Sequence, residues 1–248
     1  MCIRDRSEGA FRVTIAPLTL AWGVTTDHPR VVGREEIDTL LDLVNDSDVL
    51  FNEEDCSVML RREGQALDLG GIAKGWACSL TNEIYEEYGV ENAVLSIGGN
   101  IFARGSSPVT GKPFKVGFRD PEKGEQSYMA TLLLQNEVIA VSGGYERFFE
   151  QDGVRYQHIM DPSTGAPAVS DVTSVGVISA DGAYADFMST TLYVWGMEKA
   201  RAYMESGRAD CEIILLDGAT HTVYVSASLK GSFELNPDNT VDYTVVYL

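Results

Sequence analysis

The chain has 248 residues, of which 44% are hydrophobic and 23% are charged, as in ordinary globular proteins and unlike disordered or fibrous ones. Its 37 acidic side chains outnumber 19 basic ones, which gives a formal net charge of -18. Nucleic acids and anionic membrane surfaces are therefore excluded as favoured partners. A transmembrane helix is not predicted either, because no apolar run reaches the roughly 20 residues that a bilayer requires.

Hydrophobic periodicity predicts three helices along the chain. Residues 35–45 place apolar side chains at helical spacing, and the range begins with two glutamates, which suit the positive end of the helix dipole. A second helix is predicted over residues 75–88 and a third over residues 183–195, each followed by a glycine that favours a helix end. The side chains of the second helix that are expected to face inward are Ala77, Leu80, Ile84 and Tyr88.

Five apolar segments are predicted as strands. They cover residues 93–97, 129–141, 174–179, 212–216 and 222–227. Turn-like stretches without a helix separate several of them, which favours antiparallel or mixed sheets over a doubly wound parallel sheet. The chain has no repeats and no low-complexity linker, so the sequence predicts one continuous α+β domain with packed helices.

A glycine-rich segment, D-L-G-G-I-A-K-G at residues 68–75, leads directly into the second predicted helix. Main-chain N–H groups at its glycines, the helix start and the charge of Lys74 together suit a phosphate group. A glycine-rich turn with a surface lysine is the structural alternative. Because the whole protein is negatively charged, an anionic ligand would bind here only with local donors or a metal ion.

Two further glycine pairs occur along the chain. S-I-G-G-N at residues 96–100 favours a simple turn or bulge. S-G-G-Y-E-R-F at residues 142–148 gathers polar side chains around its glycines, and Ser142 with Gly143 is a candidate binding element. Three sites of close backbone approach suggest one extended ligand.

His158 precedes a strong turn signal, D-P-S-T-G at residues 161–165. A histidine in such a place is as often a structural residue as a general base, and both interpretations stay open. Asp186 and Thr190 lie four residues apart in the third predicted helix, so a carboxylate and a hydroxyl share one helix face. This pair suits part of a magnesium shell, while helix capping and back-bonding are the structural alternative.

Five segments in one order carry a resemblance to a known family. They are S-E-G-A-F at 7–11, D-L-G-G-I-A-K-G at 68–75, S-G-G-Y-E-R-F at 142–148, H-I-M-D-P-S-T-G at 158–165 and A-D-F-M-S-T at 185–190. Together they resemble the ApbE family, the FAD:protein FMN transferases, from Ser7 to nearly the end of the chain. Residues 1–6 do not read as family sequence, so we expect a non-native leader at 1–6 and the ApbE-like domain at 7–248, without the family's N-terminal segment.

The resemblance implies an ApbE-like, T-fold-like α+β fold and a magnesium-dependent transferase. Such an enzyme splits FAD, links FMN to a Thr or Ser hydroxyl of an acceptor redox protein, and releases AMP. This covalent protein flavinylation would take place outside the cytoplasm in the full-length protein, in the periplasm or on a lipoprotein anchor. Two alternatives stay open: an FAD pyrophosphatase that gives FMN and AMP, and a flavin-binding module without chemistry.

The resemblance also implies roles for individual residues. His158 and Asp161 are the candidates for handling the proton of the acceptor hydroxyl. The expected metal ligands are the carbonyl of Gly71 and the side chains of Asp186 and Thr190. The expected FAD contacts are Ala10, Phe11, Arg12, Asp68, Lys74 and Ile159, to which the glycine pair adds Ser142 and Gly143.

Overall fold

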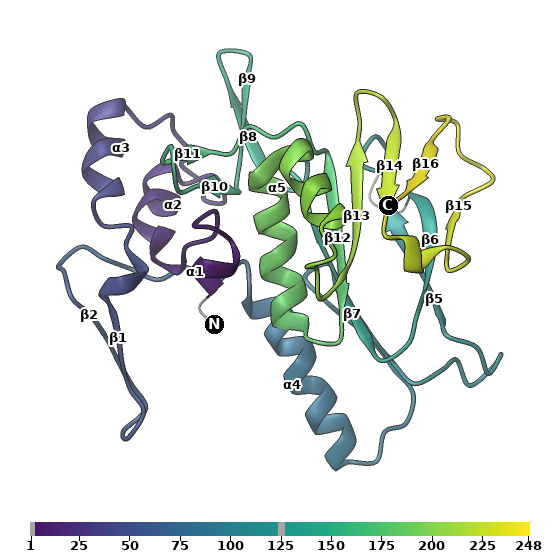
Figure 1. Ribbon diagram of the computed structural model, residues 1–248. Helices are drawn as coiled ribbons and strands as arrows, with labels where there is room; N and C mark the ends of the chain where they lie inside the picture. The colour runs from purple at the N-terminus through teal and green to yellow at the C-terminus, as the bar shows by residue number, and fades with distance from the viewer. Residues whose placement is uncertain (1–2, 124–126) are drawn as a thin grey trace. The chain divides into compact units, whose positions relative to one another are not determined.

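The computed structural model describes residues 3–123 and 127–248 (Figure 1). The chain folds into two compact units. Unit 1 contains the residues up to Gly70 together with Gly144–Val169. Unit 2 contains Gly71–Gly143 and Ser170–Leu248. The two units therefore alternate along the sequence, and each is described separately below.

Unit 2 is built on a seven-stranded mixed sheet with the order β16-β14-β13-β12-β7-β4-β3. Its strands are β3 (Ala93–Ile97), β4 (Asn100–Arg104), β7 (Glu137–Ser142), β12 (Ser174–Ser179), β13 (Glu212–Asp217), β14 (Thr222–Val225) and β16 (Thr244–Tyr247). Neighbours run antiparallel, except that β14 and β16 are parallel. The predicted α+β class with a mixed sheet is thus confirmed.

A second sheet of unit 2 has the order β15-β6-β5. Its strands are β5 (Phe114–Arg119), β6 (Tyr128–Leu134) and β15 (Phe233–Leu235), and the 3-10 helix η3 (Ala227–Leu229) precedes the last. Phe118 and Leu132 of this sheet share one buried core with Ile139 and Ile214 of the large sheet. Residues 129–141, predicted as one strand, form β6 and β7 instead, because Asn136 takes a positive φ of 58° and turns the chain between them.

Two helices, α4 (Ala73–Glu87) and α5 (Gly182–Glu205), lie together on the other face of the large sheet (Figure 1). Asp181 caps the start of α5 by accepting a hydrogen bond from the backbone N–H of Tyr184. The predicted end of the third helix at Gly196 is partly right. Helical geometry breaks at this glycine, where φ is 77°, but a second helical stretch continues to Glu205.

The inward face predicted for the second helix was wrong for three of its four residues. Leu80, Ile84 and Tyr88 are exposed and Ala77 is half-buried, whereas Gly75 and Cys78 are buried. The prediction followed the large apolar side chains, but α4 meets its neighbours with small residues, which let two backbones approach closely. The apolar residues spaced four apart consequently face away from the core.

The closest approach of α4 and α5 is at Gly75 and Gly182. A Cβ atom placed on Gly75 would lie 1.9 Å from the carbonyl oxygen of Gly182, and one placed on Gly182 would lie 2.2 Å from the carbonyl oxygen of Gly75. Both contacts are far below van der Waals distance, and both involve backbone atoms that cannot rotate away. The two helices are therefore held in register by backbone contact.

We expect Gly75→Ala to lower the free energy of unfolding by about 2 kcal/mol or more, because the new methyl group has no space. Chemical denaturation followed by circular dichroism measures this. Gly33→Ala is the matched control, since no atom lies within 4 Å of a Cβ placed there, and its effect is expected to stay within about 1 kcal/mol. Equal stability of both variants would show that α4 and α5 adjust easily.

Unit 1 combines short helices with small two-stranded sheets. Its helical elements are α1 (Ile3–Arg6), η1 (Val13–Ile15), α2 (Ala16–Trp22), α3 (Arg34–Leu41) and η2 (Asp46–Asp48). Its strands form the pairs β1 (Val49–Asn52) with β2 (Ser57–Leu60), β8 (Phe148–Gln151) with β9 (Val154–Gln157), and β10 (Met160–Asp161) with β11 (Ala166–Pro167).

The core of unit 1 joins its two chain segments. Leu18, Trp22 and Ile37 form a buried cluster with Met160, which comes from the second segment. The indole N–H of Trp22 also donates a hydrogen bond of 3.0 Å to the carbonyl of Gly165. The first predicted helix is confirmed in α3, with Ile37 inward, although α3 ends at Leu41, before residue 45. Among the described residues no helix is both long and apolar enough to cross a membrane.

Candidate functional site

The carboxylate of Asp186 is the centre of the site in unit 2. Asp186 lies in the first turns of α5 and is 3% exposed. Its Oδ2 accepts a hydrogen bond of 3.0 Å from the backbone N–H of Gly75, and the Nζ of Lys74 lies 3.3 Å from its Oδ1. The contact of α4 with α5 thus brings together a lysine and a carboxylate that are 112 residues apart. Both were predicted as site residues.

The role of Gly75 differs from the interpretation of its sequence motif. We expected the N–H groups of this glycine-rich segment to face outward toward a phosphate. The N–H of Gly75 instead points inward and binds Asp186, while its missing side chain admits α5. Gly71, the expected carbonyl ligand, lies in the turn that precedes α4.

Hydroxyl groups surround the next turn of α5. The Oγ of Ser142, at the end of β7, lies 2.8 Å from the Oγ of Ser189 and 3.4 Å from the Oγ1 of Thr190. Ser189 also donates a hydrogen bond to the backbone carbonyl of Asp186. Sequence reasoning named Ser142 and Thr190 but missed Ser189, whose place between Asp186 and Thr190 was the available signal. Gly143, which follows Ser142, is buried.

The metal ligands expected from the sequence offer only oxygen donors. They are the buried carboxylate of Asp186, the hydroxyl of Thr190 and the backbone carbonyl of Gly71. Within residues 3–123 and 127–248, no group of three or more His, Cys, Asp or Glu side chains is placed to hold a metal ion. Such a sparse oxygen set does not suit zinc, but it fits magnesium, which takes one or two protein carboxylates and completes its shell with water and phosphate oxygens.

Unit 1 carries the remaining predicted residues, in two groups. In the first group, the backbone N–H of Asp68 donates a hydrogen bond of 2.8 Å to the carbonyl of Val13, directly after the predicted stretch Ala10, Phe11 and Arg12. The side chain of Asp68 caps its own turn by accepting from the N–H of Gly70 at 2.8 Å.

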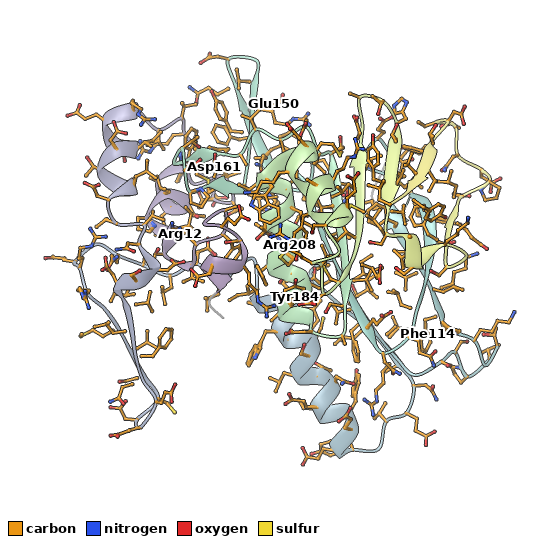
Figure 2. The ribbon with its side chains drawn as sticks, in the orientation of Figure 1. Arg12, Phe114, Glu150, Asp161, Tyr184 and Arg208 are labelled. Carbon is orange, nitrogen blue, oxygen red and sulfur yellow. The ribbon has the colours of Figure 1, made fainter. Side chains whose placement is uncertain are left out.

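The stretch at residues 10–12 is fixed locally by Ser7. The hydroxyl of Ser7, which is fully buried, accepts a hydrogen bond from the N–H of Phe11, and the carbonyl of Ser7 accepts one from the N–H of Ala10. Phe11 itself is 6% exposed. Figure 2 labels Arg12, whose guanidinium lies 3.2 Å from the position that a Cβ atom on Gly9 would take.

The second group in unit 1 consists of His158, Ile159 and Asp161. The backbone N–H of His158 donates to the carbonyl of Arg147 at 3.1 Å, and its Nδ1 lies 3.2 Å from the same oxygen. An N–H at Nδ1 would donate a hydrogen bond to that carbonyl, and Nε2 would then carry the lone pair that can accept a proton. Ile159 is buried and its N–H donates to the side chain of Gln157.

The carboxylate of Asp161 is occupied by hydrogen bonds from its own turn. Its Oδ1 accepts hydrogen bonds from the N–H and the hydroxyl of Ser163, and its Oδ2 accepts one from the hydroxyl of Thr164. Its backbone carbonyl accepts from the N–H of Gly165 at 2.8 Å. These bonds confirm the predicted turn chemistry, and they favour His158 over Asp161 as the group that handles a proton.

Cys78 is buried on α4 beside this site and is expected to be unreactive. Burial and the Asp186 carboxylate raise the pKa of its thiol to about 11, although Lys74 opposes the shift. At pH 7.5 the thiol therefore stays protonated, and we expect iodoacetamide to label Cys78 at least about tenfold more slowly than the exposed Cys56. Peptide mass mapping over time measures both rates, and equal rates would show that α4 opens readily.

The ApbE family model matches residues 2–215 of this chain. The FAD:protein FMN transferase of Klebsiella pneumoniae is 33% identical over 209 residues, which cover 84% of this chain and 64% of that protein. The FAD:protein FMN transferase of Treponema pallidum is 32% identical over 212 residues, which cover 81% of this chain and 59% of that protein. The chain thus spans about three fifths of the length of these curated relatives.

Two solved structures share the fold. The ApbE protein of Thermotoga maritima superimposes with a TM-score of 0.78 at 31% identity, covering 95% of this chain and 72% of that one. The flavin transferase ApbE of Vibrio cholerae gives a TM-score of 0.78 at 29% identity, covering 93% and 73% of the two chains. The family expected from the five sequence segments is therefore confirmed.

Proposed function

The chain belongs to the ApbE family, and on this premise we propose that it transfers FMN from FAD to a Thr or Ser hydroxyl of an acceptor protein. The similarity to curated FAD:protein FMN transferases supports the transferase reaction and FAD as its substrate. The acceptor would be a redox protein, and the full-length enzyme would act outside the cytoplasm.

The observation that carries this proposal is the buried carboxylate of Asp186, held between α4 and α5 beside Lys74. A protein with a net charge of -18 repels an anionic dinucleotide unless positive charge is gathered locally. Lys74 and the start of α4 supply such charge in unit 2. We assign the pyrophosphate of FAD to these groups, with Ser142 and Gly143 as further donors.

Asp186, Thr190 and the carbonyl of Gly71 would hold a magnesium ion at this place. When bound, magnesium supplies charge neutralisation for the pyrophosphate oxygens. Side chains of the protein supply charge stabilisation and orientation. Lys74 would stabilise negative charge on the departing AMP, and the proposed contacts at Ala10–Arg12, Asp68 and Ile159 would orient the flavin half of FAD.

The proposed reaction exchanges one phosphorus–oxygen bond for another. The acceptor hydroxyl oxygen attacks the phosphorus of the FMN half, and the bond from this phosphorus to the bridging oxygen breaks. AMP leaves with the bridging oxygen, and the proton of the hydroxyl passes to His158. His158 is suited to this task because its Nδ1 lies at the carbonyl of Arg147, which directs basicity to Nε2.

Incubation with FAD and Mg²⁺, with and without a co-expressed candidate acceptor, tests the proposal. The expected results are AMP release that depends on the acceptor and an acceptor mass increased by one FMN. Equal AMP release in both reactions would identify an FAD pyrophosphatase instead. Tight FAD binding that is indifferent to Mg²⁺, without AMP, would identify a binding module.

A further inference from the structure

Asn100, the first residue of β4, is a buried amide without hydrogen-bond partners. Asn100 is 1% exposed, and neither its Oδ1 nor its Nδ2 has a hydrogen-bond partner among the residues that the structure describes. Buried polar groups are almost always paired, because burial removes their hydrogen bonds to water. A partner that moves or binds at this position would therefore remove an existing energetic cost.

The alternation of β4 shows which way Asn100 faces. Phe102, two residues further along the strand, forms a cluster with Cys78 of α4 and Val138 of β7. Ile101, between them, packs against the opposite core between the two sheets. Residues i and i+2 of a strand share a face, so Asn100 faces the side of the sheet that α4 and α5 cover.

Lys74 passes over the turn that precedes Asn100. Gly98 and Gly99 form a tight turn between β3 and β4, with φ values of 55° and 95°. A Cβ atom placed on Gly98 would lie 2.8 Å from the Cδ and 4.0 Å from the Cε of Lys74. The turn therefore lies against the stem of this lysine, and Ile97, at its other end, pairs with Asn100.

The ammonium of Lys74 is only loosely attached to Asp186. Its Nζ lies 3.3 Å from Oδ1 and 3.5 Å from Oδ2, whereas strong ammonium–carboxylate hydrogen bonds measure about 2.7–2.9 Å. A cation that ligates Asp186 would compete with this ammonium for the same oxygens. An acceptor beside the turn at Gly98 would then keep the charge of Lys74 near the bound phosphates.

We propose that Asn100 is a positioning residue for Lys74: its Oδ1 accepts a hydrogen bond from the ammonium when a divalent cation occupies Asp186. Lys74 thus has two positions, one on the carboxylate in the free protein and one on the carboxamide in the loaded site. In the second position the ammonium faces the pyrophosphate, and the unpaired oxygen of Asn100 is satisfied. The inference rests on the proposed function, because that function places the cation on Asp186.

Calorimetric titration of the whole protein with inorganic pyrophosphate, in Mg²⁺ or in EDTA, tests this role through binding alone. Asn100→Leu keeps the size of the side chain and removes its acceptor. With Mg²⁺ we expect it to weaken pyrophosphate binding about tenfold, and in EDTA by less than about twofold, since Lys74 then stays on Asp186. Asn100→Asp keeps an acceptor oxygen and is expected to bind within about threefold of the natural protein.

A double-mutant cycle with Lys74→Met shows whether the effect passes through the lysine. Asn100→Leu is expected to have no further effect in the Lys74→Met background, because the ammonium that it positions is gone. Asn239→Leu is the matched control: the Oδ1 of Asn239 is also buried and unpaired, but its Nδ2 binds the carbonyl of Met129 in the other sheet. This variant should bind pyrophosphate as the natural protein does.

Three outcomes would overturn the inference: unchanged affinity in Asn100→Leu, an equal loss in both lysine backgrounds, or a loss in Asn100→Asp as large as in Asn100→Leu. If Asn100→Leu does not fold, as judged by its melting temperature, Asn100→Ala replaces it in the cycle. If pyrophosphate binds and the double-mutant cycle gives the expected result, but no FMN is transferred, only the proposed function is refuted. Absence of pyrophosphate binding by the natural protein would refute both.

Discussion

Asp186→Asn is expected to reduce FMN transfer by about 10²- to 10⁴-fold, the largest effect of any single change in unit 2. Asparagine has the same shape but no charge, so it neither attracts a divalent cation nor balances Lys74. Asp186 is buried and also accepts the N–H of Gly75, which an amide oxygen still does. Activity should therefore fall while the fold remains, as measured by AMP release at saturating Mg²⁺ and by the melting temperature.

Glu198→Gln is the control for this variant, because Glu198 is an exposed carboxylate on the same helix, α5. It removes the same formal charge from the protein but should leave the rate unchanged. Raising the concentration of Mg²⁺ or Mn²⁺ is expected to recover part of the activity of Asp186→Asn. A variant that keeps the rate and the magnesium dependence of the natural protein would place the metal ligands elsewhere.

His158→Ala is expected to slow FMN transfer by about 10²- to 10⁴-fold, the usual contribution of a general base. FAD should still bind, since alanine removes the imidazole but not the backbone hydrogen bond from residue 158 to Arg147. Flavin fluorescence measures binding, and single-turnover transfer to the acceptor measures the rate. The loss should be smaller at high pH, where less assistance is needed to deprotonate the acceptor hydroxyl.

His28→Ala serves as the control, because His28 is an exposed histidine of the same unit. We expect it to match the natural protein in both measurements. Asp161→Asn is a further comparison, and its main expected effect is a lower melting temperature, because Asp161 holds its turn together. If His158→Ala keeps full transfer activity and Asp161→Asn loses it, Asp161 rather than His158 takes the proton of the acceptor hydroxyl.

Local signals in the sequence were sufficient for several elements of the fold. Helix α3 follows from apolar spacing behind two glutamates, and β3, β12 and β13 follow from short β-branched runs. The pair of Asp186 and Thr190 was visible because helical geometry fixes residues four apart. These features depend on neighbours in the chain, which the sequence displays directly.

Features that depend on distant contacts were not predictable in the same way. The exposure of Leu80 and Ile84 follows from the glycine contact between α4 and α5, which overrides the preference for burying large apolar residues. The sequence predicts only a simple turn or bulge at residues 96–100. The packing of Lys74 against Gly98 and the burial of Asn100, which link this turn to the site, depend on contacts that the sequence does not display. The hydroxyl group of Ser189 likewise gains its role from Ser142, 47 residues away.

The interleaving of the two units has a consequence for synthesis on the ribosome. Unit 1 cannot be completed until residue 169 has emerged, and unit 2 still awaits helix α5 and the strands from β12 to β16 at that point. Closing these long loops makes assembly dependent on late, non-local contacts, which slows it. A nascent chain that stalls before Ser170 would expose the edge of β7 with which β12 later pairs. This protein should therefore depend on chaperones more than a protein of equal size with contiguous domains.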